Sequence, residues 1–189
     1  IEKVFGILPT SWVWRFGALL GSLMHCLAKK RRKIVAYNLS LVHPEKSEQE
    51  IAVLTKQVFR HSTANLTSSI NTGFISDKRM AKIVTIKGQK NFANLDPDKG
   101  AILMVLHMGN WELLGRIAQL FGTEKPISSM YRPLPNPLLD AHVRSKRERS
   151  GTKLFSRKRG LIDANKFLRK GGVLAILSDQ HAGNAGIHL

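Results

Sequence analysis

From residue 101 onward, short runs of consecutive apolar residues alternate with longer segments of helical pattern. The runs "AILMVL" (101–106) and "VLAILS" (173–178) are typical of strands buried on both faces of a sheet. Because strands and helices alternate with short connections, we expect right-handed crossover units and an α/β fold with a mainly parallel sheet flanked by helices. Strands are expected at 101–106, 126–131, 152–156 and 173–178, and helices at 111–122, 136–151 and 159–172.

Helical patterns dominate the earlier part of the chain. Residues 34–43 predict a helix that Pro44 stops, because proline cannot continue a helix. Ser47 and Glu50 have the spacing of a capping box, in which each residue satisfies a free backbone N–H of the other. A helix that begins there would place four apolar residues on one face, namely Ile51, Leu54, Val58 and Phe59.

The chain is expected to divide near residues 80 to 90. The segment "IVTIKG" (83–88) alternates like a short strand and ends in a glycine. We therefore predict a helical N-terminal region (1–80) and an α/β core (81–189). Residues 178–189 follow the last strand without a closing helix, so the C-terminal part of the fold is expected to be missing.

A membrane-associating segment is expected near the N-terminus, at about residues 5–33. Residues 12–28, "WVWRFGALLGSLMHCLA", are largely apolar, but at 17 residues they reach only the lower limit for crossing a bilayer. The basic cluster "KKRRK" (29–33) follows directly. This order is typical of a membrane-surface or shallowly inserted anchor, and no cleavage site indicates a removed signal peptide. The alternative is a soluble amphipathic helix with a solvated basic end.

The overall charge is strongly positive. The 30 Lys and Arg residues outnumber 13 Asp and Glu residues, and the formal net charge is +17. Such an excess attracts nucleic acid, an anionic membrane surface, or an acidic substrate or carrier. In the basic stretch 144–159 only Phe155 could stack on bases, which favours docking of phosphates or an acidic partner, or a solvated face, over nucleic acid. The single cysteine, Cys26, excludes an intrachain disulfide and indicates a reducing compartment.

Polar residues follow three of the expected strands. His107 comes after the first strand, Arg132 after the second, and Asp179 with Gln180 after the last. Functional groups of parallel α/β sheets collect at the carboxyl ends of strands. The sequence therefore predicts a site at this edge of the sheet.

His107 and Glu112 form a candidate catalytic pair. On one continuous helix they would lie about 140° apart, since each residue turns about 100°. If His107 instead precedes the helix and Asn110 caps it, a turn at Gly109 could bring the Glu112 carboxylate back toward the imidazole. A carboxylate at one ring nitrogen would leave the other free to accept a proton. The alternative is a structural turn with an ordinary first-turn acid.

The chain contains no recognisable motif that would supply a protein nucleophile. The chain has no G-x-S-x-G elbow, and Cys26 lies in the apolar N-terminal segment. A base without a nucleophile suggests direct attack by a substrate hydroxyl. We expect no metal, because His181 and His188 lack an indicated third ligand, and no P-loop, G-x-G-x-x-G, C-x-x-C or H-E-x-x-H motif is present.

The segment "LHMGNWELLG" resembles the H-x4-D/E block of the bacterial lipid A biosynthesis (lauroyl/myristoyl) acyltransferases, within the glycerolipid acyltransferase superfamily. Further blocks agree in order, namely "RRKIVAYNLSLVHPEKSEQE", "MYRPLPNPLLD", "RKRGLIDANKFLRKGG" and "LAILSDQ". The resemblance implies a glycerolipid-acyltransferase-like fold. It also implies transfer of an acyl chain from acyl carrier protein, or acyl-coenzyme A, to a hydroxyl of a glycolipid such as a lipid A precursor.

Carried over by position, the resemblance assigns roles to the candidate residues. His107 would be the general base and Glu112 its orienting carboxylate, with no covalent acyl-enzyme and no cofactor. The substrate-binding residues would be Arg132, Asp179, Gln180 and Asn110. The protein would work at the cytoplasmic face of the inner membrane, with a carrier protein or CoA thioester, a glycolipid and the anionic membrane surface as partners, and without nucleic acid. The alternative is a catalytically inactive, basic membrane- or polyanion-binding module.

Overall fold

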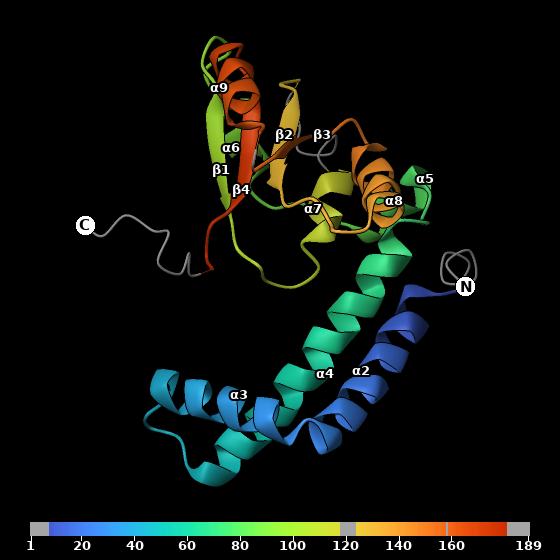
Figure 1. Cartoon of the computed structure of the whole chain (residues 1–189), viewed down its shortest axis with the longest axis vertical. Coiled ribbons are helices and arrows are strands. Elements are labelled where there is room, and N and C mark those ends of the chain that lie inside the picture. The colour runs from blue at the N-terminus through green and yellow to red at the C-terminus, as the bar shows by residue number, and fades with distance from the viewer. Residues whose placement is uncertain (1–7, 118–123, 158, 181–189) are drawn as a thin grey trace. The chain divides into compact units, whose positions relative to one another are not determined.

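A computed structural model describes residues 8–117, 124–157 and 159–180 of the chain (Figure 1). The chain divides into two compact units, with the division between Ile75 and Ser76. The first unit is helical, and the second contains the sheet. The chain therefore has the general plan of a helical N-terminal region followed by an α/β core.

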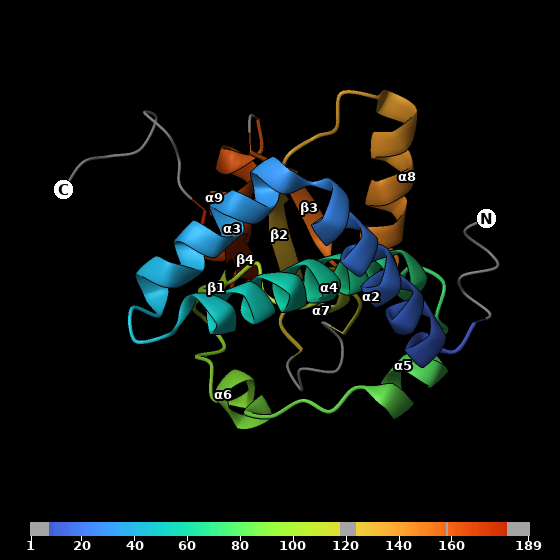
Figure 2. The ribbon, with the colours of Figure 1, turned by 90° about the horizontal axis from the view of Figure 1, so that it is seen from below.

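The helical unit is built around two helices that pack side by side, α2 (Thr10–Leu27) and α4 (Glu48–Thr72), as Figures 1 and 2 show. Between them in sequence lies α3 (Lys29–Val42), which ends just before Pro44 as predicted. The capping box at the start of α4 is confirmed. The Ser47 side chain accepts from the Glu50 N–H, and the Glu50 carboxylate accepts from the Ser47 backbone N–H at 2.9 Å.

Small residues allow α2 and α4 to approach closely. A Cβ atom on Gly17 would lie 2.6 Å from the Ala64 Cα, and one on Gly21 would lie 2.5 Å from the Phe59 carbonyl oxygen. The face predicted for α4 is confirmed in part, since Ile51 is buried but Val58 is exposed. Within the described residues, no helix combines the length and the apolar character needed to cross a bilayer.

The second unit contains a parallel sheet of four strands, which confirms the predicted α/β class. The strand order is β1-β4-β2-β3, so the last strand in sequence lies between the first two. The strands are β1 (Ala101–Val105), β2 (Ile127–Tyr131), β3 (Lys153–Ser156) and β4 (Val173–Leu177). The helices are α5 (Asp77–Ile83), α6 (Gln89–Ala93), α7 (Glu112–Ile117), α8 (Pro137–Glu148) and α9 (Leu161–Arg169).

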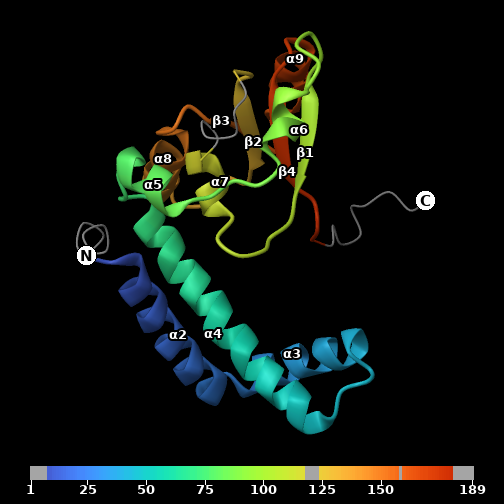
Figure 3. The same cartoon turned by 180° about the vertical axis from the view of Figure 1, so that it is seen from behind.

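Helix α9 covers one face of this sheet (Figures 1 and 3). Ala164 of α9 packs with Phe155 and Leu174 of the strands. The rings of Phe155 and Phe167 pack edge to face, with 5.6 Å between their centroids. The helix ends before Gly171, whose φ of +81° suits a residue without a Cβ. This buried face leaves the opposite face and the carboxyl ends of the strands to form a site.

The strand predicted at 83–88 is wrong. Ile83 is instead the last residue of α5, and the Val84 N–H donates to the Met80 carbonyl at 3.1 Å, which completes the helix. Residues 84–88 form no strand. The alternation of side chains was local, whereas a strand also needs a neighbouring strand to pair with its backbone.

Candidate active site

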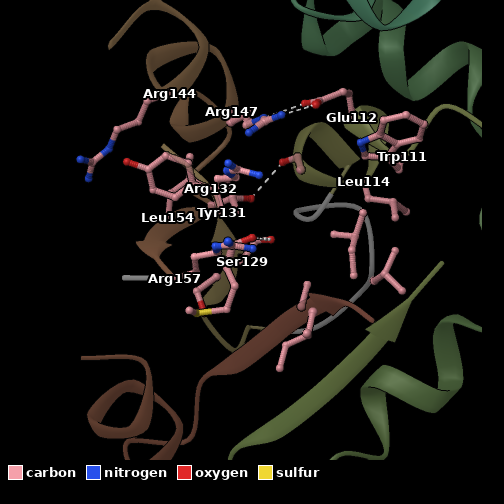
Figure 4. A pocket seen from close by; sticks show the side chains of 18 of the residues that line it. Trp111, Glu112, Leu114, Ser129, Tyr131, Arg132, Arg144, Arg147, Leu154 and Arg157 are labelled. Atoms are coloured by element: carbon pink, nitrogen blue, oxygen red, sulfur yellow. Dashed lines mark hydrogen bonds and ion pairs between the residues drawn. The ribbon is translucent and has the colours of Figure 1, made fainter. Parts of the chain in front are cut away.

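A cavity of about 630 Å³ lies within the α/β unit at the carboxyl ends of the strands (Figure 4). Its wall includes His107, Arg132 and Gln180, the polar residues that follow β1, β2 and β4. Apolar side chains from the strands, among them Leu103 and Val105, line another part of it. Three of the strand-end residues that the sequence predicted therefore border one cavity.

His107 is held by Asp179 at two points. The His107 backbone N–H donates to Asp179 Oδ2 at 2.8 Å, and His107 Nδ1 lies 2.7 Å from Asp179 Oδ1. The imidazole also packs edge to face against the Trp111 indole, with 5.4 Å between the ring centroids. Hydrogen bonds from the His107 side chain and backbone lower the pKa of the Asp179 carboxyl, so this group is an anion at neutral pH.

The sheet register explains this contact between residues 72 positions apart. Strand β1 pairs with β4 so that Val105 lies opposite Leu177, and the Ser178 N–H continues the ladder to the Val105 carbonyl at 3.3 Å. His107 and Asp179 each follow these partners by two residues. They therefore leave the sheet side by side.

Glu112 pairs with Arg147 instead of with His107. Glu112 lies in the first turn of α7, as predicted, and its carboxylate accepts from Arg147 Nε at 2.8 Å and from Arg147 Nη2 (Figure 4). This two-point pair is partly buried and raises the pKa of the Arg147 guanidinium. The predicted contact of Glu112 with the imidazole is thus not the one in the described structure, and the catalytic role of Glu112 stays a prediction.

The turn between β1 and α7 has the backbone that the sequence indicated. Gly109 has a φ of +59°, a conformation that a side chain would disfavour. The Asn110 carbonyl accepts from the Leu113 N–H at 3.1 Å, which starts the helix. The turn therefore separates His107, before the helix, from Glu112 inside it, but it directs the carboxylate toward α8.

Two arginines leave the neighbouring strands β2 and β3 in the same way. Tyr131 lies opposite Ser156, and the Arg157 N–H donates to the Tyr131 carbonyl at 3.0 Å. Arg132 and Arg157 are the next residues of the two strands, and both line the cavity. Within the described part of the chain, neither guanidinium has a hydrogen bond or ion pair. They leave positive charge available to an anionic substrate group.

The loop after β2 and the start of α8 are fixed by local hydrogen bonds. Asn136 caps α8 by accepting from the Leu138 N–H at 3.0 Å, and Pro137 occupies the start of the helix as predicted. Asp140 reaches back to accept from the Leu134 N–H at 2.8 Å. These contacts hold the segment between Arg132 and Arg147.

Sequence reasoning did not single out Arg147 and Arg157. Both lie in the basic stretch 144–159, whose composition alone indicates a single basic surface. The structure divides this stretch: Arg144, Arg147 and Arg157 line the cavity, whereas Lys146, Arg149 and Lys153 are not among its lining residues. Helical spacing could have separated Arg147 from its neighbours, but only the strand pairing locates Arg157 beside Arg132.

Among the described residues, no group of three His, Cys, Asp or Glu side chains is arranged to hold a metal ion. His181 and His188, the two histidines considered as ligands, lie outside the described residues.

The parallel α/β sheet carries a histidine–aspartate pair and arginines at the carboxyl ends of its strands. A site of this kind is suited to proton transfer on an anionic substrate. The chain belongs to the bacterial lipid A biosynthesis acyltransferase family, whose model matches residues 1–188. The resemblance that the sequence indicated is thereby confirmed.

Curated relatives support the same family. The chain is 34% identical over 179 residues to a lipid A biosynthesis lauroyltransferase of Escherichia coli (strain K12). The aligned region covers 93% of this chain and 56% of the relative. It is 31% identical over 151 residues to a lipid A biosynthesis acyltransferase of Haemophilus influenzae, covering 79% of this chain and 47% of the relative. The chain thus spans about half the length of the curated relatives it matches.

Proposed function

We propose that this protein transfers a fatty acyl chain from an acyl-carrier-protein or CoA thioester to a hydroxyl of a glycolipid such as a lipid A precursor. Family membership supports the reaction class. The observation that carries the proposal is the His107 imidazole at a cavity that arginines and apolar side chains also line. An acyl transfer between a thioester and a phosphorylated lipid needs a base, a cationic region and an apolar region.

In the proposed reaction, His107 Nε2 accepts the proton of the acceptor hydroxyl. The hydroxyl oxygen attacks the thioester carbonyl carbon and forms a tetrahedral oxyanion. The intermediate then collapses, the carbon–sulfur bond breaks, and the imidazolium returns the proton to the leaving thiolate. The products are an ester and a free thiol, so no acyl-enzyme and no cofactor are required.

The charged residues of the cavity have a binding role in this proposal. Arg132 and Arg157 would bind a phosphate of the acceptor or donor, since guanidinium groups form paired hydrogen bonds with phosphate oxygens. Glu112 would act through Arg147, which it holds at the cavity wall. Asn110 and Gln180 remain candidate substrate contacts. The apolar side chains of Leu103 and Val105 would lie against the acyl chain.

The test is an acyl-transfer assay with the protein expressed from its whole gene. A panel of acyl-carrier-protein and acyl-CoA thioesters is offered with a purified lipid A precursor, and products are measured by mass spectrometry. His107→Ala should lower the rate about 10²- to 10⁴-fold, the usual worth of a general base. His142→Ala, which removes a histidine that is not among the residues lining the cavity, should transfer at the parental rate.

Two outcomes would refute this function. Retained transfer in His107→Ala would exclude the proposed base. A protein that binds anionic lipid but transfers no acyl group from any donor would favour the alternative, a catalytically inactive membrane- or polyanion-binding module.

We further propose that the helical unit binds the anionic inner membrane surface at its cytoplasmic face. Helix α2 exposes an apolar stripe along one side, and the basic residues 29–33 follow it at the start of α3. Apolar side chains beside a basic cluster favour the interface of an anionic bilayer. The stripe consists of Trp12, Phe16, Leu19, Leu23 and Leu27, each more than half exposed.

Co-sedimentation with lipid vesicles tests this association. The protein should bind vesicles that contain phosphatidylglycerol more tightly than pure phosphatidylcholine vesicles, and binding should weaken as salt screens the basic cluster. Leu19→Asp should reduce binding. Leu161→Asp is the matched control, because Leu161 of α9 is 72% exposed, close to the 71% of Leu19. Equal binding by both variants would exclude α2 as the membrane contact.

A further inference from the structure

The carboxylate that contacts His107 is contributed by β4 and not by the H-x4-E block. Asp179 Oδ1 lies 2.7 Å from His107 Nδ1, while Oδ2 accepts from the backbone N–H of the same residue at 2.8 Å. Both oxygens of one carboxylate are therefore committed to one histidine. A two-point contact restricts both the position of the backbone and the rotation of the imidazole.

We propose that Asp179 is the positioning residue for His107, holding its imidazole with the proton on Nδ1 and the lone pair on Nε2 directed to the substrate. This inference rests on the proposed acyl transfer, and it assigns to Asp179 the orienting role that the resemblance to the acyltransferase family implied for Glu112. Glu112 would instead act through its ion pair with Arg147.

The tautomer follows from the chemistry of the partner. An ionised carboxylate has only acceptor oxygens, so a hydrogen bond at 2.7 Å requires a proton on Nδ1. The lowered pKa of Asp179 keeps that carboxyl ionised at neutral pH. In a neutral imidazole with Nδ1 protonated, Nε2 must carry the lone pair. This is the nitrogen that a general base needs.

Glu112 has a different and competing partner. Its two oxygens accept from Nε and Nη2 of Arg147, which joins α7 to α8. To reach His107, the carboxylate would have to leave a partly buried arginine without its partner, and an unpaired charge there is costly. The described structure therefore favours two separate pairs, His107 with Asp179 and Glu112 with Arg147.

Other ionisable groups surround the same cavity. The Tyr131 phenol comes from β2, and the charged groups are Glu112 of α7, Arg132 of the β2 end, Arg157 of the β3 end, and Asp140, Arg144 and Arg147 of α8. Within the described residues, Asp179 is the ionisable partner in hydrogen-bond contact with the imidazole. The proposed orienting role therefore belongs to Asp179.

The first test measures the pH dependence of acyl transfer in Asp179→Asn. The variant keeps the size of the side chain but can offer an N–H to Nδ1, which favours the wrong tautomer. We expect kcat to fall about 10²- to 10⁴-fold with little change in KM, as for other orienting carboxylates. The acidic limb of the pH profile should move to lower pH, because an imidazole without a neighbouring anion is protonated less readily.

Asp163→Asn is the matched control, since Asp163 is an exposed aspartate of α9 that does not line the cavity. It should keep the parental kcat and the parental pH profile. Asp179→Glu restores a carboxylate, and its kcat should be at least about tenfold higher than that of Asp179→Asn. If the asparagine variant does not fold, Asp179→Ser takes its place. Parental kcat in Asp179→Asn, or lost activity with an unmoved acidic limb, would overturn the inference.

A second measurement does not depend on activity. Nitrogen NMR of the ¹⁵N-histidine-labelled protein, with His107→Ala to assign the signal, reports which ring nitrogen carries the proton. We expect Nδ1 to be protonated in the parent and this preference to be lost in Asp179→Asn. A parent without acyl transfer but with this tautomer would refute the proposed function and retain the role of Asp179. A parent with transfer but with His107 protonated on Nε2 would overturn the role of Asp179 alone.

Discussion

Glu112 and Arg147 form a two-point ion pair that joins α7 to α8 at the wall of the cavity lined by His107. Their side chains are 25% and 31% exposed, so the pair is partly shielded from water. Its position links the packing of two helices to the charge of the candidate active site.

Breaking this pair should lower both stability and transfer. We expect Arg147→Gln and Glu112→Gln each to reduce the free energy of unfolding by about 1–2 kcal/mol, because each leaves a partly buried charge without its partner. Arg147→Lys should recover only part of this loss, since an ammonium cannot form the paired hydrogen bonds. Urea unfolding of the single and double variants measures the coupling.

Arg144→Gln is the control for that series. Arg144 pairs with Glu148 one turn away on the same helix, and its side chain is 47% exposed. Such helical pairs contribute roughly 0.2–0.5 kcal/mol. If Arg144→Gln costs as much as Arg147→Gln, the link between α7 and α8 has no special weight.

The contact between Asp179 and His107 should make stability depend on pH at the acid end. The folded-state pKa of Asp179 is lowered, so the ionised carboxyl stabilises the fold above the pKa of the unfolded chain, about 4. This contribution is lost as the pH falls through the lower folded-state pKa. The unfolding free energies of the parent and Asp179→Asn should therefore differ most near neutrality and converge below about pH 4. A difference that stays constant down to the most acidic conditions would contradict this linkage.

The contact of α2 with α4 should not tolerate a larger residue at Gly17. A Cβ there would lie 2.1 Å from Thr67 Oγ1 and 2.6 Å from the Ala64 Cα, so the helices must separate. We expect Gly17→Ala to destabilise the helical unit by about 1–3 kcal/mol in spite of its better helix propensity. Gly115→Ala is the control, because among the described residues its Cβ would meet nothing closer than 3.9 Å. Thermal unfolding should show that Gly115→Ala is as stable as the parent or slightly more stable. Equal losses of stability in the two variants would contradict the close packing.

Lys125 should stabilise the amino-terminal ends of the strands. Its ammonium donates to the carbonyl oxygens of Pro97 and Lys99 at 2.9 Å and of Gly171 at 3.0 Å. Lys125→Met keeps the length of the side chain but removes all three donors, and we expect a loss of about 1–3 kcal/mol. Lys99→Met, at a side chain that is 80% exposed, should change stability by less than about 0.5 kcal/mol. Similar urea midpoints for the two variants would show that the three hydrogen bonds contribute little.

Local features of the fold could be predicted from the sequence because neighbouring residues decide them. The Ser47–Glu50 capping box, the proline at the start of α8 and the positive φ of Gly109 each depend on a few consecutive residues. The apolar runs of β1 and β4 likewise identify themselves. The same local reasoning failed at 83–88, where an alternating pattern lacks a strand to pair with.

The sequence by itself determined the α/β class, the four strands and the edge of the sheet where His107, Arg132 and Asp179 would gather. Only the tertiary structure decided which of them meet. Strand β4 inserts between β1 and β2, and this order brings Asp179 to His107. Glu112, only five residues from His107, instead pairs with Arg147 on α8. Strand order and helix packing arise from contacts between distant segments, so spacing along the chain cannot assign the carboxylate that contacts the histidine.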